Sequence, residues 1–219
     1  PLTGLGNRRA LHETIDGMLF AARAGDPNGI PGTRFVLMVI DLDRLKPIND
    51  QHGHEAGDRV LTQVAESLRA VSRASDTVVR WGGDEFVMLC RDADMVIAST
   101  LAERVRAALA KQIFRVGDGA VARTSCSIGF APYPFVPEAP EHLDWEDSLA
   151  LADAALYDAK RTRNSWVGWS GTRRTPQVPK LLEAVERDPS ALEEGGFLDV
   201  RRRSPTFDDT VDNLVAFKG

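Results

Sequence analysis

The chain has 219 residues, of which 43% are hydrophobic and 27% are charged, and its formal net charge at pH 7 is −5. These values are typical of a soluble globular domain with a short additional segment, and the negative charge argues against a general nucleic-acid-binding protein. They leave room for a local basic pocket that binds a nucleotide. The sequence contains no apolar run near the roughly 20 residues of a membrane span and no signal-peptide pattern, so we expect a cytoplasmic chain.

Hydrophobic periodicity and turn residues predict alternating helices and strands. In chain order we predict a helix over 5–23 that Asn7 can cap, a loop over 25–33, a strand over 35–40 and helices over 45–51 and 56–71. Two strands over 77–80 and 86–89 form a hairpin, followed by a helix over 95–111 and a second hairpin over 114–121. A strand over 124–131, a proline-rich loop over 132–140, a helix over 145–161 and a strand over 165–169 complete the series.

This order predicts an α+β fold with a central antiparallel or mixed sheet flanked by helices. After residue 171 the composition changes to basic, proline-containing and charged stretches, with room for two helical turns over 181–187. We therefore expect one domain over 1–170 and a tail over 171–219, partly helical or irregular, with little core of its own.

The two cysteines, Cys90 and Cys126, lie in apolar, strand-like surroundings without C-x-x-C spacing. This context favours two buried, reduced thiols over a disulfide.

Three carboxylates are expected to meet where two strands end together. Asp41 ends the predicted buried strand, and the first hairpin carries Gly82, Gly83, Asp84 and Glu85 at its tip. Taken singly, such acids are more often turn formers or helix caps. Taken together they suit Mg²⁺, which binds one or two carboxylates with substrate phosphates, while the glycines let a phosphate or base approach the backbone.

Polar side chains that could recognise a nucleotide follow Asp41 within one stretch, and they are Lys46, Asn49, His54 and Asp58. Asparagine offers a donor and an acceptor, and an ionised aspartate accepts from the N1–H and 2-amino groups of guanine. Backbone amides after Asp41 could cradle phosphates at the start of a short helix. Each residue alone is better explained as part of a solvated turn, but the combination favours a guanine nucleotide.

The stretch 80–86 reads RWGGDEF. It contains the motif that names the GGDEF family of diguanylate cyclases, which the sequence resembles. Four further stretches match in the family's order, so that the resemblance covers roughly residues 1–170; they are 1–9, 41–58, 125–131 and 152–160. The resemblance implies a palm-like fold of the nucleotidyl cyclase (ferredoxin-like) type and an enzyme that condenses two GTP into cyclic di-GMP. Each domain would hold one GTP, so catalysis would require a homodimer.

The resemblance also implies roles for individual residues. Asp41, the Leu42 carbonyl, Asp84 and Glu85 would hold Mg²⁺ or Mn²⁺, with Asp84 and Glu85 catalytic. Asp84 is the candidate base for the 3′-hydroxyl, and Glu85 is either a further ligand or a positioning acid. Substrate binding would involve Lys46, Asn49, His54, Asp58, Gly82, Gly83, Lys160 and Arg163.

A second site is suggested by Arg73 and Asp76, which form an R-x-x-D pattern ahead of the hairpin. In an unfamiliar protein this would be a helix end followed by a turn aspartate. In the family it resembles the product-binding inhibitory site, with Arg104 as a third member and Arg106 as a weaker choice.

The segment 160–164 departs from the family pattern, because it is one residue shorter and lacks a glycine. Leu45 also stands where an aromatic residue is common. An alternative function is therefore a catalytically weak module that binds cyclic di-GMP or GTP. A cyclase with altered base choice is a third reading, against which Asp58 counts because a carboxylate repels the acceptor edge of adenine.

Overall fold

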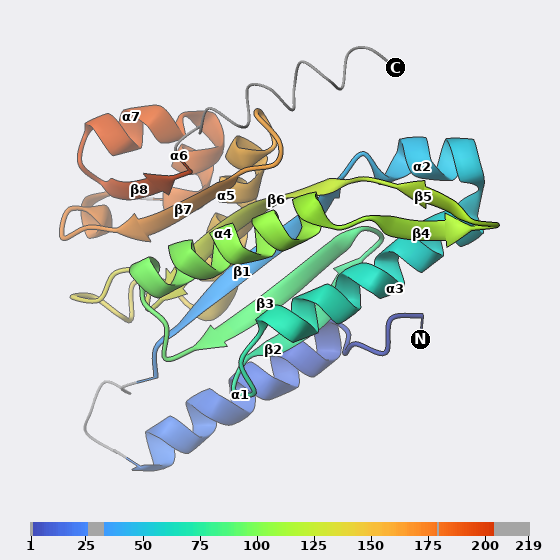
Figure 1. The fold of residues 1–219 in the computed structure, drawn as a ribbon. Helices are drawn as coiled ribbons and strands as arrows, with labels where there is room; N and C mark the ends of the chain where they lie inside the picture. The colour runs from blue at the N-terminus through green and yellow to red at the C-terminus, as the bar shows by residue number, and fades with distance from the viewer. Residues whose placement is uncertain (1, 26–32, 179, 204–219) are drawn as a thin grey trace.

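The computed structural model describes residues 2–25, 33–178 and 180–203, and it is built around a six-stranded sheet (Figure 1). The strand order is β2-β3-β1-β6-β7-β8, in which β6 and β7 are parallel and the other neighbours are antiparallel. The strands are β1 (Phe35–Asp43), β2 (Thr77–Gly82), β3 (Glu85–Arg91), β6 (Ser125–Tyr133), β7 (Trp166–Gly171) and β8 (Leu198–Arg202). A separate two-stranded sheet consists of β4 (Phe114–Gly117) and β5 (Ala120–Ala122).

Helices cover both faces of the sheet. They are α1 (Arg8–Gly25), α2 (Leu45–His52), α3 (His54–Val71), α4 (Met95–Lys111), α5 (Trp145–Ala159), α6 (Leu181–Arg187) and α7 (Pro189–Glu194), with a 3₁₀ turn η1 at Thr175–Gln177. The mixed architecture confirms the predicted α+β class. In the described ranges, no helix combines the length and apolarity that crossing a bilayer demands.

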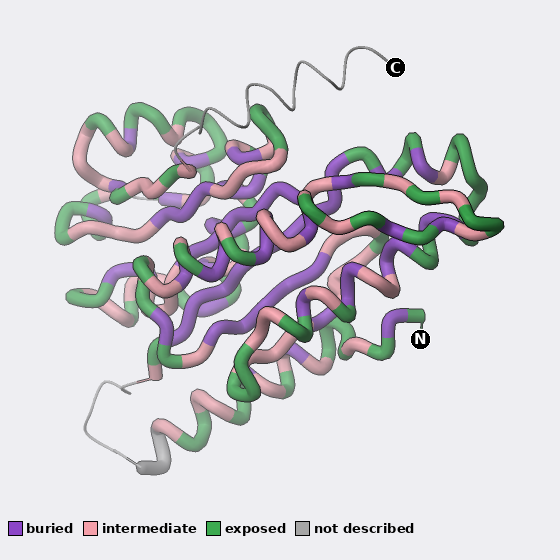
Figure 2. Tube along the Cα trace, in the orientation of Figure 1, coloured by how far each residue is buried: buried purple, intermediate pink, exposed green. Residues whose placement is uncertain are grey.

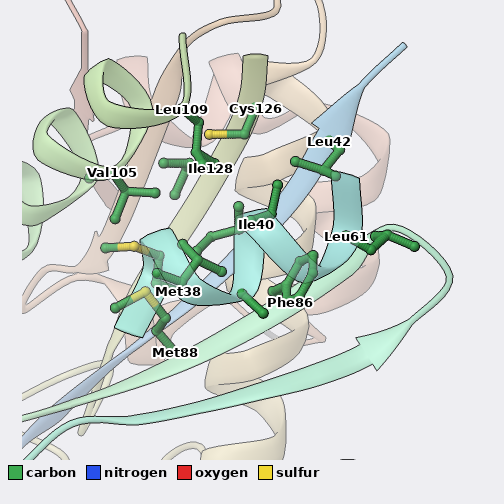
Figure 3. Packing of buried hydrophobic residues seen from close by; sticks show 14 of the residues in the cluster. Met38, Ile40, Leu42, Leu61, Phe86, Met88, Val105, Leu109, Cys126 and Ile128 are labelled. Atoms are coloured by element: carbon green, nitrogen blue, oxygen red, sulfur yellow. The ribbon is translucent and has the colours of Figure 1, made fainter. Parts of the chain in front are cut away.

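Two apolar clusters pack against the sheet, one on each face. Buried residues run along the strands of the sheet, whereas buried and exposed residues alternate along the covering helices (Figure 2). Because successive strand residues point to opposite faces, Met38 and Ile40 of β1 join the cluster beneath α3 and α4, where Phe86 of β3 also packs (Figure 3). Leu37 and Val39 join the cluster beneath α1 and α5. Burial on both faces explains why β1 is a continuous apolar run in the sequence.

The helices and strands expected before residue 171 are all present, with ends shifted by a few residues. Most of the loop predicted over 25–33 lies outside the described residues. The helix predicted over 5–23 begins at Arg8, because the Asn7 side chain accepts a hydrogen bond from the Ala10 amide at 3.1 Å and caps it. The helix predicted over 95–111 has those bounds. Cys90 and Cys126 are buried free thiols, as predicted, and burial raises the pKa of Cys90 to about 12.

Residues 172–203 are more ordered than the expected tail, although the helical turns predicted over 181–187 are present as α6 (Leu181–Arg187). This part of the chain forms α6, α7 and β8, and β8 extends the sheet beyond β7 (Figure 1). Their buried apolar residues join the cluster beneath α1 and α5; they are Leu181, Val185, Leu192 and Leu198. The expectation of little core is therefore wrong for this part. Helices this short are unstable alone and form through tertiary packing, so their sequence signal is weak. Residues 204–219 lie outside the described residues, and the division of the chain at residue 170 stays a prediction.

Candidate functional site

The hairpin between β2 and β3 has a two-residue loop. Gly82 pairs with Glu85, so the loop consists of Gly83 and Asp84. Gly83 has a φ of 24° and occupies the first loop position, where type II′ turns take glycine. Of the four residues predicted at the hairpin tip, Gly82 and Glu85 belong to the strands, and Gly83 and Asp84 form the turn.

This hairpin brings two acids to the end of β1. Asp41 and Glu85 are direct cross-strand partners, so their side chains lie on the same face of the sheet. The Leu42 amide donates to the Asp84 carbonyl at 3.3 Å, which fixes the loop against β1. The structure therefore brings together the three carboxylates that the sequence predicted to meet.

Asp41 is the most buried of these acids, with 8% of its surface exposed. Its Oδ2 lies 2.9 Å from the Lys160 Nζ, which follows α5. Burial is the main reason that the pKa of Asp41 rises to about 6; Lys160 opposes the rise, and the charges of Asp84 and Glu85 add to it. Asp41 is thus ionised near neutral pH in surroundings that favour a cation.

The donor set suits a magnesium ion that arrives with its substrate. In the part of the chain that the structure describes, no three acidic, histidine or cysteine side chains are arranged to hold a metal by themselves. Mg²⁺ usually takes one or two protein carboxylates and completes its shell with phosphate oxygens and water. Asp41 with Asp84 or Glu85 supplies that number of carboxylates.

Asn49 offers a buried acceptor with no partner. Its Oδ1 is inaccessible and forms no hydrogen bond within the described residues. It lies against Gly57, where a Cβ would stand 1.9 Å from that oxygen. Sequence reasoning missed Gly57, although a glycine inside a predicted helix was the available signal. An unpartnered buried acceptor indicates that a ligand donor completes it.

Lys46, His54 and Asp58 are exposed on α2 and α3. Within the described ranges, none of them forms a hydrogen bond or ion pair with the hairpin acids. Asp58 lines an open cleft of about 330 Å³ beside Arg59 and Arg115. Their roles in nucleotide binding stay predictions.

Arg8 reaches the hairpin, which sequence reasoning did not foresee. Its Nε donates to the Trp81 carbonyl at 2.8 Å, and its guanidinium lies 4.6 Å from the centre of the Trp81 ring. A Cβ on Gly82 would stand 3.6 Å from Arg8 Nη2 and 3.9 Å from Glu85 Oε2. A cation and a carboxylate thus flank the strand glycine of the motif.

The Asp43 carboxylate is hydrogen-bonded within the protein, and we do not assign it as a metal ligand. It is 5% exposed, and its carboxylate accepts hydrogen bonds from Ser125 Oγ at 2.5 Å, Ser127 Oγ at 2.8 Å and the Asn164 amide at 3.0 Å. Arg163, beside Asn164, is exposed, and its assignment to a phosphate stays a prediction.

The residues of the predicted inhibitory site do come together. Arg73, Asp76 and Arg104 line one pocket of about 150 Å³ at the other end of β2 and β3 from the hairpin loop. The Asp76 Oδ2 accepts from the Arg73 amide at 2.8 Å, and Arg104 Nη2 donates to the Val71 carbonyl at 2.5 Å. Arg106 points elsewhere and bonds to Glu103.

Comparison with known proteins identifies the family. The profile described as "Diguanylate cyclase, GGDEF domain" matches residues 1–165. The chain belongs to the GGDEF domain family. A relative is the bifunctional diguanylate cyclase/cyclic di-GMP phosphodiesterase MucR of Pseudomonas aeruginosa, 38% identical over 159 residues, which are 73% of this chain and 21% of MucR. The matched part of this chain covers less than half of the length of each of three curated relatives, namely 21%, 44% and 35%.

Solved GGDEF domains have the same palm-like fold, as expected. A truncated TpbB from Pseudomonas aeruginosa comprising only the GGDEF domain is 37% identical, with a TM-score of 0.63 over 74% of this chain and 89% of that one. The GGDEF domain of DgcB from Caulobacter crescentus, in complex with c-di-GMP, is 30% identical, with a TM-score of 0.64 over 75% of this chain and 91% of that one.

Proposed function

We propose that this GGDEF domain is an active diguanylate cyclase, which condenses two GTP into cyclic di-GMP and two pyrophosphates. The observation that carries the proposal is the convergence of Asp84 and Glu85 on Asp41, with Lys160 beside them. A domain that had lost catalysis would be expected to have lost at least one of these acids. The curated relatives TpbB and DosC are named diguanylate cyclases, which supports the assignment.

In the proposed reaction the 3′-hydroxyl of one GTP attacks the α-phosphorus of the other, and pyrophosphate leaves. Asp41, the Leu42 carbonyl, Asp84 and Glu85 would hold a divalent metal, which, when bound, supplies stabilisation of the negative charge that develops on the phosphate. Asp84, which lies on the hairpin loop, would accept the hydroxyl proton.

Basic side chains and the Asn49 side-chain amide would hold the nucleotide. Lys160 would exchange its carboxylate partner Asp41 for a phosphate oxygen, and Lys46 and Arg163 would add charge there. The buried Oδ1 of Asn49 would accept from a guanine N–H, and His54 and Asp58 would line the same nucleoside. Gly82 and Gly83 would let the substrate approach the hairpin backbone closely.

Because each domain offers one such site, two domains must face each other across a two-fold axis to form both phosphodiester bonds. The proposed active form is therefore a homodimer, at least during turnover.

We also propose product inhibition at the pocket of Arg73, Asp76 and Arg104. Two guanidinium groups next to one carboxylate suit a ligand that carries both phosphate and guanine edges. The complex of DgcB with c-di-GMP supports a product site in this family.

The second candidate function is a binding module without turnover. It is favoured by the short segment after Lys160, in which Arg163 is exposed and, within the described residues, forms no hydrogen bond or ion pair with the three acids. The experiment that separates the two is GTP turnover with Mg²⁺, measured on the chain alone and on the chain fused to a dimerising coiled coil. Cyclic di-GMP in either sample supports the cyclase, whereas Mg²⁺-dependent GTP binding without product in both supports the binding module.

A further inference from the structure

The C-terminal extension, residues 172–203, lies directly beside the segment that carries Lys160. The GGDEF match ends at residue 165, so this extension is additional to the family domain. Its strand β8 pairs with β7. Arg202 is the last paired residue, opposite Val167, and the Arg203 amide donates to the Trp166 carbonyl. We propose that the extension supports the nucleotide site, with Arg202 and Arg203 acting as positioning residues for the 160–164 segment and hence for Lys160. What Lys160 binds rests on the proposed function.

Arg203 is linked to that segment through α4. Its side chain is only 11% exposed, and its Nε lies 3.2 Å from Glu103 Oε2. Glu103 also accepts from Trp166 Nε1 at 3.0 Å and from Arg106 Nη2 at 2.7 Å. Arg106 in turn donates to the Asn164 side chain at 2.7 Å. The Glu103 carboxylate therefore accepts hydrogen bonds from side chains of α4, β7 and the extension.

The same chain of contacts reaches the end of β1. The Asn164 amide donates to Asp43, which lies two residues after Asp41 on the same face of the strand. Burial alone would raise the pKa of Glu103, but hydrogen bonds from Arg106 and Trp166 and the nearby cations outweigh it and lower that pKa. Glu103 is therefore an ionised acceptor that can hold Arg106 and Arg203 in place.

Arg202 holds the other side of the segment. It donates to Glu193 of α7 through Nη1 at 2.8 Å and Nη2 at 2.7 Å, and its Nε lies 3.7 Å from Asp158 Oδ2. Asp158 belongs to the last turn of α5, two residues before Lys160. The extension thus contacts both the entry to the 160–164 segment and, through Glu103, its exit.

The backbone of the segment explains why such support is needed. Arg163 and Asn164 are consecutive non-glycine residues with φ values of 56° and 42°. Left-handed conformations are costly for residues other than glycine, and they persist only where surrounding contacts enforce them. No glycine occurs between Lys160 and Asn164, so contacts from outside the segment have to supply that enforcement.

The test uses the full chain, with Arg203→Ala, Arg202→Ala and Arg203→Lys. Arg173→Ala is the matched control, because Arg173 is an exposed extension residue paired with Glu138 and lies outside these contacts. Binding of a non-hydrolysable GTP analogue with Mg²⁺ is measured by calorimetry, and hydrogen exchange of the 160–166 amides is measured without ligand. We expect weaker binding by about fivefold or more and faster exchange for both alanine variants, partial recovery for Arg203→Lys, and wild-type behaviour for Arg173→Ala.

A double-mutant cycle that combines Arg203→Ala with Lys160→Ala, with binding of the GTP analogue as the readout, distinguishes a positioning role from general destabilisation. If the arginines act through Lys160, adding Arg203→Ala to Lys160→Ala produces no further loss of binding. Unchanged exchange at 160–166, or a loss of binding that adds fully to that of Lys160→Ala, would overturn the inference. If the wild-type chain bound no GTP analogue and formed no cyclic di-GMP, the proposed function would fail, and the exchange data would still decide the positioning role.

Discussion

Asp41 is an acid held where its own charge is unfavourable for folding. Burial raises its folded-state pKa from 3.8 to about 6. Between these values the folded protein binds a proton that the unfolded chain has released, so this group's contribution to the free energy of unfolding falls as pH rises from about 4 to about 6. An unfavourable charge retained at a site is typical of function rather than of stability.

Replacing Asp41 with asparagine should remove the unfavourable effect of the buried charge on the free energy of unfolding. In metal-free buffer, Asp41→Asn should be more stable than wild type above pH 6, and the difference should shrink towards zero below pH 4. Lys160 loses its partner but is 39% exposed and can be hydrated. Urea unfolding of both proteins across this pH range measures the difference. A wild-type chain that gained stability over Asp41→Asn with rising pH would contradict the assignment.

At the scale of elements, the packing of α5 on β6 sets the position of Lys160. A Cβ on Gly129 of β6 would stand 2.1 Å from the Ala152 carbonyl oxygen and the Leu156 amide nitrogen of α5. These are backbone atoms, so the helix cannot approach the strand this closely unless residue 129 is glycine.

Gly129→Ala should therefore destabilise the domain by about 1–3 kcal/mol or more, because overpacking must push α5 away from the sheet. The control is Gly17→Ala in α1, where an added Cβ meets nothing within 4 Å and alanine should stabilise the helix by about 0.5–1 kcal/mol. Denaturant unfolding measures the free energy of unfolding of both variants. A Gly129→Ala variant as stable as wild type would contradict the close packing of α5 on β6.

The pocket between the 73–76 turn and α4 permits a separate prediction. Arg73→Ala should leave initial synthesis unchanged and raise the cyclic di-GMP concentration for half-inhibition by about tenfold or more, because a charge-assisted contact to the product is lost. Progress curves with added product measure this value. Unaltered product binding by Arg73→Ala would remove the inhibitory site from that pocket.

Hydrophobic periodicity was sufficient to predict the elements with a regular pattern of burial. The strand β1 is buried on both faces and is therefore a continuous apolar run, and α3 buries one face and therefore has one apolar stripe. The sequence did not reveal α7 or β8, since their apolar residues are few: α7 packs against α6 and β8, and β8 forms by pairing with β7. The residues of the acidic site were predictable by type and order. The contact of Arg8 with Trp81 depends instead on how two segments distant in the sequence pack, and the contact of Asn49 with Gly57 depends on how α2 packs against α3.

At the scale of the whole molecule, the residues expected at one site fall on separate elements. Asp41, Glu85 and Lys160 come from β1, β3 and the end of α5, and the fold alone brings them together. Lys46, His54 and Asp58 face solvent, which is consistent with a site completed by ligand and by a second domain.

Dimerisation gives the proposed cyclase a distinctive concentration dependence. If two domains must meet, the specific activity should rise with protein concentration and level off once the dimer dominates. Fusion to a coiled coil should raise activity at low concentration and flatten this dependence. Activity per domain that is independent of concentration in a chain shown to be monomeric by sedimentation would contradict the shared-site mechanism.

The most direct test of the acidic site is incubation of the purified chain, at high concentration, with GTP and Mg²⁺, followed by chromatographic separation of the nucleotides. Wild type should form cyclic di-GMP, and Asp84→Ala and Glu85→Ala should form none while keeping the wild-type circular dichroism spectrum and melting temperature. Product formation that survives in Glu85→Ala, or its absence from the wild-type chain even when it is dimerised by fusion, would contradict the account.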